Sequence, residues 1–167
     1  MSEEKQTTGS MVLGWWSQNI GNREAAHARA LSARLRRAET VDVLGERAVI
    51  ELAGRLGIGA NSARLPHFIT MVRLLAELRT HEGTSLARHI GGADPVLSEL
   101  RFQRLLRSEG EEFEDLMRRA ILMADRKCNV AAFGGDVLYW GEAVRQRWCF
   151  QYFGAEASSE TSREIVE

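Results

Sequence analysis

Apolar side chains recur at helical spacing through most of this 167-residue chain. One such series consists of Phe133, Val137, Trp140, Val144, Trp148 and Tyr152. Steps of three or four residues are the period of an α-helix that buries one face. No segment alternates polar and apolar residues over the length of a strand, and neither Asn-Gly nor Asp-Gly occurs. The pattern therefore predicts an all-α protein.

Residues that begin or end helices separate these segments. They predict a compact bundle of about seven to nine helices in a single domain, packed either as one unit or as two helical subdomains. Gly57 is the residue type that ends a helix, and Asp94-Pro95 are the types that begin one. Gly134-Gly135 is expected to kink or divide the last helix. The expected helices cover residues 12–18, 23–38, 43–56, 63–79, 85–90, 94–108, 111–126 and 129–153.

Both ends of the chain are rich in polar and charged residues. We expect a flexible N-terminal tail over residues 1–10, a helical domain over 11–154 and an acidic, disordered C-terminal tail over 155–167. The whole chain has a formal net charge of -1. The tails carry -1 and -3, which leaves +3 for residues 11–154. The near-neutral total thus hides a mildly basic body.

Several classes of protein are disfavoured by what the sequence lacks. No apolar run approaches the ~18 residues that a membrane-spanning helix needs, and the first residues do not resemble a secretion signal. The 2 cysteines, Cys128 and Cys149, have neither disulfide-framework nor CxxC spacing. We therefore expect a soluble, cytoplasmic protein that does not contact membranes.

Catalytic and metal-binding motifs are also missing. The four histidines have no zinc-ligand spacing, and nucleotide-binding loops and the common hydrolase motifs do not occur. We expect no catalytic residue, no bound metal and no cofactor. A metal-dependent helical nuclease is an alternative only if the fold gathers Asp42, Asp94, Asp125 and Asp136, because such chemistry needs converging carboxylates.

Arginine is the unusual part of the composition. The 22 basic residues comprise 20 Arg and 2 Lys. High-GC coding produces such a skew, but arginine is also the side chain that binds phosphate bidentately and stacks on bases. Four arginines of the second helix have no acid three or four residues before them, and these are Arg29, Arg34, Arg36 and Arg37. Unpaired arginines on a helix face suit sequence-independent contact with a phosphate backbone.

A second basic face is expected on the helix over residues 94–108. Arg101, Arg104 and Arg107 lie on an arc of roughly 120° there. Glu99 and Glu111 lie near them in the sequence, so this helix is less indicative of nucleic-acid binding than the second one.

A series of short segments, taken in order, resembles the CasB family, the small subunit of the type I-E CRISPR Cascade complex. The resemblance covers about residues 11–154. Its segments are Gly14-Trp15-Trp16, 33–38 (ARLRRA), 84–88 (TSLAR), 100–106 (LRFQRLL), 116–120 (LMRRA), Asn129-Val130, 136–140 (DVLYW) and 144–148 (VRQRW) leading to Tyr152.

This resemblance implies an all-α, non-enzymatic subunit of an antiviral surveillance complex guided by crRNA. Two copies of the subunit would contact the large subunit and the backbone subunits. They would help to hold the guide–target duplex and the displaced non-target DNA strand, while a separately recruited helicase-nuclease cleaves DNA. The implied partners are therefore the other Cascade subunits, a second copy of this chain, crRNA and both DNA strands.

The resemblance also assigns arginines to family positions. Arg36 and Arg37 fall on a double arginine, Arg101 and Arg107 on basic positions of the LRFQRLL-like segment, and Arg119 on the second arginine of the LMRRA-like segment. Arg64 lies near a further basic position. The predicted nucleic-acid-binding set is Arg29, Arg34, Arg36, Arg37, Arg64, Arg101, Arg104, Arg107 and Arg119.

The alternative to a nucleic-acid role is an all-helical protein–protein scaffold. In that hypothesis the arginine faces bind acidic partners, and Trp15, Trp16 and Trp140 are the candidate anchors of the interface. Trp15 and Trp16 are adjacent and point in different directions, so one can belong to the core while the other serves an interface.

Overall fold

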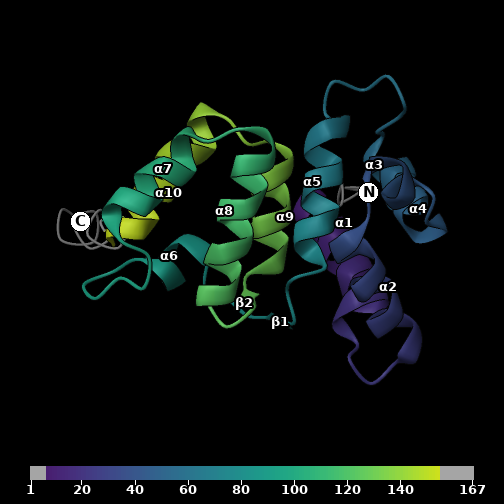
Figure 1. The fold of residues 1–167 in the computed structure, drawn as a ribbon, viewed down its shortest axis with the longest axis horizontal. Helices are drawn as coiled ribbons and strands as arrows, with labels where there is room; N and C mark the ends of the chain where they lie inside the picture. The colour runs from purple at the N-terminus through teal and green to yellow at the C-terminus, as the bar shows by residue number, and fades with distance from the viewer. Residues whose placement is uncertain (1–6, 155–167) are drawn as a thin grey trace, which may run out of the picture.

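The computed structural model describes residues 7–154, and within that range almost every element is a helix (Figure 1). The predicted all-α fold is confirmed, and the described range contains ten α-helices rather than the expected seven to nine. They are α1 (Thr8–Trp16), α2 (Ala26–Arg37), α3 (Thr40–Leu44), α4 (Arg47–Leu56), α5 (Leu65–Leu75), α6 (Leu86–Ile90), α7 (Glu99–Arg107), α8 (Gly110–Met123), α9 (Val130–Leu138) and α10 (Glu142–Phe153).

Three shorter elements complete this range. A π-helix, η1 (Ser17–Gly21), continues α1. The strands β1 (Thr80–His81) and β2 (Lys127–Cys128) pair in parallel and were not expected from the sequence. Each strand is only two residues long, which is too short for an alternation of polar and apolar side chains to predict it.

The helices are arranged on either side of a central pair. In Figure 1, α8 and α9 lie in the middle, α1 to α5 on one side, and α6, α7 and α10 on the other. Buried apolar side chains form one cluster that includes residues from all three parts. Trp15 and Trp16 both belong to it, and their Nε1 atoms donate hydrogen bonds to the carbonyl oxygens of Ala48 (2.8 Å) and Leu75 (3.1 Å). The expectation that one tryptophan serves an interface is therefore wrong, because each indole finds its acceptor inside the core.

The glycine pair does not divide the helix, because Gly134 and Gly135 both lie inside α9. A Cβ atom on Gly134 would lie 2.5 Å from Cγ1 of Val12 on α1, which is too close for any side chain. The glycine therefore lets α1 pack closely on α9. The expected helix over 129–153 is instead divided at residues 139–141, where α9 ends and α10 begins.

Two other helix ends show where a local sequence signal sets the boundary of a helix and where it does not. Gly57 ends α4 with a left-handed φ of 71°, as predicted. The start predicted at Asp94-Pro95 is wrong, because α7 begins at Glu99 and the Ser98 hydroxyl caps it. Before Ser98, the Leu97 N–H bonds to the Ile90 carbonyl (3.1 Å), and the Leu97 carbonyl accepts the Tyr152 hydroxyl. These bonds hold the segment in a non-helical path.

Two expected helices also differ in extent. The helix expected over 43–56 is two helices, α3 and α4, and the one expected over 63–79 ends at Leu75. At the N-terminus, α1 begins at Thr8 with Thr7 as its cap, so the last residues of the expected 1–10 tail are helical. Residues 1–6 and 155–167, and with them the rest of the predicted tails, lie outside the described residues.

Two contacts fix α10 and thereby position α7. The Asp136 carboxylate on α9 accepts hydrogen bonds from Arg147 Nη1 (2.6 Å) and Trp148 Nε1 (2.8 Å) of α10. Tyr152 at the end of α10 stacks on Phe102 of α7, with ring centroids 4.0 Å apart. Because α7 is fixed through its buried aromatic side chain, its opposite face is presented to solvent. Among residues 7–154, no helix has the length and apolar character needed to span a bilayer.

Candidate nucleic-acid interface

The exposed face of α7 carries three arginines at intervals of three residues. Phe102 and Leu105 are buried on the inner side of this helix, and Arg101, Arg104 and Arg107 are exposed on the outer side. This arrangement agrees with the predicted arc of roughly 120°. The helix period alone determined it, which is why the sequence was sufficient.

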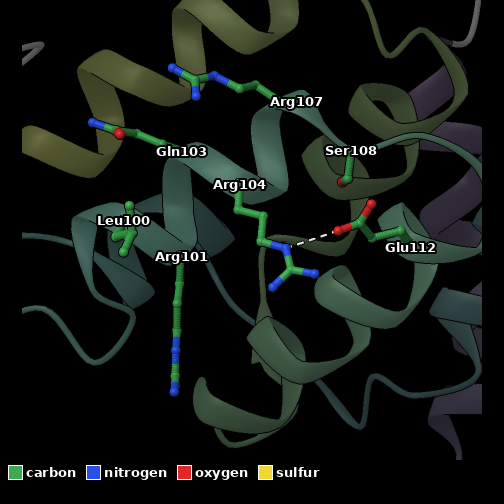
Figure 2. A pocket seen from close by; sticks show the side chains of 7 residues that line it. All are labelled: Leu100, Arg101, Gln103, Arg104, Arg107, Ser108 and Glu112. Carbon is green, nitrogen blue, oxygen red and sulfur yellow. Dashed lines mark hydrogen bonds and ion pairs between the residues drawn. The ribbon is translucent and has the colours of Figure 1, made fainter.

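A hollow of about 550 Å³ lies along this face, between α7 and the start of α8. In Figure 2, Arg101 and Arg107 extend in different directions from α7, and Arg104 lies between them. Arg104 Nε is 2.9 Å from Glu112 Oε1 on α8, so one charge of the three is compensated. Arg101 and Arg107 have no carboxylate within ion-pair distance among the described residues.

A second, smaller hollow of about 200 Å³ adjoins the first, because Arg101 and Arg104 line both. Arg119 of α8 reaches it from the opposite side. Its other lining side chains are apolar, namely Leu97, Leu105, Leu116 and Met123. Arg119 is exposed and, within the described part of the chain, makes no ion pair. We call Arg101, Arg104, Arg107 and Arg119 the α7–α8 arginine surface.

Arg34, expected to be unpaired, is held by Glu46 from the turn before α4. Its Nε and Nη2 atoms donate to the two carboxylate oxygens at 2.7 and 3.0 Å. This bidentate bond raises the pKa of Arg34 and lowers the pKa of Glu46. The inference that α2 lacks acidic partners is therefore wrong for Arg34, because its partner is twelve residues away and on another element.

Arg36 and Arg37 lie at the C-terminal end of α2, beside a hollow of about 290 Å³. The other charged residues around this hollow have both signs, and they are Glu39, Arg73, Glu111, Glu114, Asp115 and Arg118. Arg36 and Arg37 form no ion pair with the residues that the structure describes. This end of α2 is thus more balanced in charge than the α7–α8 arginine surface.

The remaining predicted arginines are tied to backbone or aromatic groups. Arg29 Nη1 donates to the Arg23 carbonyl oxygen (2.6 Å). The Arg64 guanidinium carbon lies 4.2 Å from the centroid of the Tyr139 ring, and its Nη1 donates to the Leu138 carbonyl (3.3 Å). The structure does not gather the nine predicted residues into one site. It brings four together on α7 and α8.

Ion pairs alone do not rank the two basic helices. Among the predicted arginines, α2 has one with a carboxylate partner, Arg34, and α7 also has one, Arg104. The sequence did not indicate the apolar lining of the smaller hollow, in which Met123 is partly exposed. The one available signal was an apolar residue four positions after Arg119 on the same helix face.

The nuclease alternative finds no converging carboxylates. Asp136 is buried and bonded to α10, Asp94 lies in the loop before α7, and Asp125 occupies a left-handed turn with a φ of 57°. Residues 7–154 contain no group of three or more His, Cys, Asp or Glu side chains able to hold a metal ion.

The tryptophan anchors of the scaffold hypothesis are also largely used internally. Trp15 and Trp16 are buried. Trp140 packs against Phe113, at a centroid distance of 4.9 Å, and against Trp148, at 5.0 Å.

Comparison with known proteins agrees with this architecture. The model of a family described as CRISPR-associated protein Cse2 matches residues 31–153. A chain in the crystal structure of E. coli Cascade bound to a PAM-containing dsDNA target has the same fold, with a TM-score of 0.58 and 17% identity. The match covers 89% of this chain and 95% of that one. No curated protein sequence matches.

Proposed function

This chain belongs to the CRISPR-associated Cse2 family, the small subunit of type I-E Cascade, and we propose that its α7–α8 arginine surface binds nucleic-acid backbone within that complex. The bound strand is the displaced non-target DNA or a strand of the guide–target duplex. The chain acts without catalysis, in the cytoplasm, beside the large subunit, the backbone subunits and a second copy of itself.

The observation that carries the proposal concerns Arg101, Arg107 and Arg119, which lie around two adjoining hollows and have no acidic partner among residues 7–154. Each phosphate neutralised by such a side chain releases condensed counterions, which drives binding at moderate salt. Arginine suits this task because its planar fork matches two phosphate oxygens. No base-reading pattern is required.

The apolar lining of the smaller hollow favours a single strand. Bases of a single strand are free to pack on apolar side chains while arginines contact the phosphates, whereas the bases of a duplex are stacked inside. Leu116 and Met123 lie among three arginines in this hollow. The displaced strand is therefore the better candidate than the duplex.

Modest contacts suffice for this role. In RNA-guided recognition base pairing reads the sequence, and exchange of a DNA duplex for an RNA–DNA duplex is nearly balanced in free energy. A few backbone contacts to the displaced strand shift that balance towards the open state. A net charge of only +3 over residues 11–154 is compatible with a subunit that acts in this way.

The other predicted arginines have lesser roles in this proposal. Arg34 and Arg64 would have to leave Glu46 and Tyr139 to bind phosphate, so each contributes less than an uncommitted arginine. Arg37 is exposed and extends the basic surface at the end of α2.

The test is the salt dependence of binding of a short oligothymidylate to the purified chain. The double variant R107Q/R119Q should lower the slope of log K against log salt by about 1.4, since each single-strand phosphate contact contributes about 0.7. The matched control is R47Q/R55Q, which removes two exposed arginines of α4. A control that lowers the slope as much as R107Q/R119Q would contradict the proposed site.

A further inference from the structure

Arg23, a partly buried residue in the turn before α2, has one unsatisfied guanidinium nitrogen. Its Nη1 atom is buried and has no hydrogen-bond partner among residues 7–154. Burying such a donor without an acceptor costs free energy, and a charged one costs more. An unsatisfied donor of this kind in a folded protein calls for a physical explanation, of which an absent ion is one.

Three further arginines lie around Arg23. Ser32 of α2 packs against the end of α5, where its Oγ donates to the Ala76 carbonyl (2.8 Å). Arg29 and Arg36 are on the same helix face, three residues before and four residues after Ser32. Arg79 follows Ala76 by three residues, at the entry to β1. We call Arg23, Arg29, Arg36 and Arg79 the α2 arginine cluster.

Hydrogen bonds join the segments that carry these groups: Arg29 Nη1 donates to the Arg23 carbonyl oxygen (2.6 Å), and the Arg79 N–H donates to the Arg126 carbonyl oxygen (2.8 Å). Burial, followed by the charges of Arg79, Arg36, Arg29 and Arg126, lowers the pKa of Arg23. All four charges have the same sign as the guanidinium on which they act. The cluster is thus a region of repulsion in the folded chain.

Acidic residues compensate only the edge of this region. Arg126 is paired with Glu77, at 2.9 Å. Arg23, Arg36 and Arg79 form no ion pair with any residue that the structure describes. Like charges held together destabilise a protein. A bound anion would reduce the repulsion and would supply the acceptor that Arg23 Nη1 lacks.

We propose that the α2 arginine cluster binds a phosphate-bearing anion, and that the subunit becomes more stable when it does. The cluster shares no residue with the α7–α8 arginine surface, so the proposal stands whether or not that surface binds a strand. The phosphate comes either from a nucleic-acid backbone or from a free di- or polyphosphate. Both present the same oxygens to the guanidinium forks.

The first measurement is the thermal unfolding midpoint of the full chain, in sodium pyrophosphate and in sodium chloride at equal ionic strength. At ten times the dissociation constant, pyrophosphate should raise the midpoint by about 3–6 °C. Arg79→Gln should lose most of this rise. In chloride at low ionic strength, R79Q should unfold at the same or a higher temperature than the original chain, because it removes a repulsive charge.

Two comparisons separate specific binding from general charge effects. Arg55→Gln removes an exposed arginine at the end of α4 and should keep the full rise. Arg36→Gln provides a second test, should R79Q fold poorly. The proposal would be overturned if pyrophosphate raised the midpoint equally in the original chain, R79Q and R36Q. It would also be overturned if R55Q lost as much of the rise as R79Q.

Binding of a short oligothymidylate distinguishes the two sources of phosphate. If R79Q weakens this binding about tenfold and also loses the pyrophosphate effect, the ligand is a nucleic-acid backbone. If only the pyrophosphate effect is lost, the ligand is a free phosphate compound. R107Q/R119Q reports independently on the α7–α8 arginine surface, so failure of one site is distinguishable from failure of the other.

Discussion

Arg118 and Arg119 are consecutive residues of α8 with opposite surroundings. Arg118 lies 3.0 Å from Asp115, 3.4 Å from Glu114 and 3.8 Å from the buried carboxylate of Glu77. Arg119 lies beside α7 without an acidic partner in the described range. One arginine therefore stabilises the fold, and its neighbour is available to a ligand.

Substituting each of these arginines should separate stability from binding. Arg118→Gln should lower the free energy of unfolding by about 1–2 kcal/mol, because Glu77 then keeps only Arg126 as its partner. Arg119→Gln should change it by no more than about 0.5 kcal/mol but should weaken oligothymidylate binding. Urea denaturation and fluorescence anisotropy measure the two quantities. Equal destabilisation by R118Q and R119Q would show that Arg119 also has a structural role.

The glycine pair of α9 provides a matched test of helix packing. Gly134→Ala should destabilise the chain by about 1–3 kcal/mol, since its Cβ would overlap Val12 on α1. Gly135→Ala should be neutral or stabilising by up to about 1 kcal/mol, because nothing lies within 4 Å of the added atom and alanine favours the helix. Equal urea midpoints for the two variants would refute the close approach of α1 and α9.

The ion pair between Arg34 and Glu46 should contribute to the way the free energy of unfolding falls at acidic pH. Its hydrogen bond lowers the pKa of Glu46 in the folded chain. The contribution is therefore complete above the unfolded-state pKa, about 4.3, and is lost as the pH falls through the folded value.

The variant Arg34→Gln should accordingly have a shallower decrease in unfolding free energy below about pH 5. At pH 7 the loss should be no more than about 1 kcal/mol, because the Arg34 side chain is 56% exposed. Arg37→Gln, which removes an arginine without an ion pair in the described part of the chain, is the control. Parallel acid limbs for R34Q and R37Q would rule out the linkage.

The two cysteines should differ in reactivity towards a thiol reagent. Cys128 is fully buried, and burial, with the nearby Glu82 and Asp136 charges, raises the pKa of its thiol to about 12. At pH 8 only about one molecule in ten thousand then carries the reactive thiolate. The folded Cys149→Ser variant should therefore be nearly inert, whereas the denatured variant should react fully. Rapid reaction of folded C149S would show that Cys128 is accessible.

Local periodicity explains which parts of this protein the sequence predicts well. The arc of arginines on α7 and the glycine end of α4 depend on residues within a few positions of one another, and both were predicted correctly. The pairs Arg34–Glu46 and Arg104–Glu112 join residues 12 and 8 positions apart on different elements, so helix-spacing rules do not detect them.

Tertiary contacts explain the remaining errors. Asp94-Pro95 has suitable residue types for a helix start. The backbone of Leu97 instead forms hydrogen bonds with Ile90 and Tyr152, so α7 begins only at Glu99, after its cap Ser98. Gly134-Gly135 has the residue types of a helix break, yet both residues lie inside α9 and Gly134 leaves room for Val12. In each case the local propensity was real and a contact with a distant residue outweighed it.

The most direct test of the central claim uses a reconstituted Cascade complex with guide RNA. Complexes containing the original subunit or R107Q/R119Q should assemble equally, because neither arginine packs in the core. The variant complex should lose its opened DNA target about tenfold faster at moderate salt, measured as the dissociation rate of a labelled target duplex. An unchanged dissociation rate at every salt concentration, with assembly intact, would show that the α7–α8 arginine surface does not hold the nucleic acid.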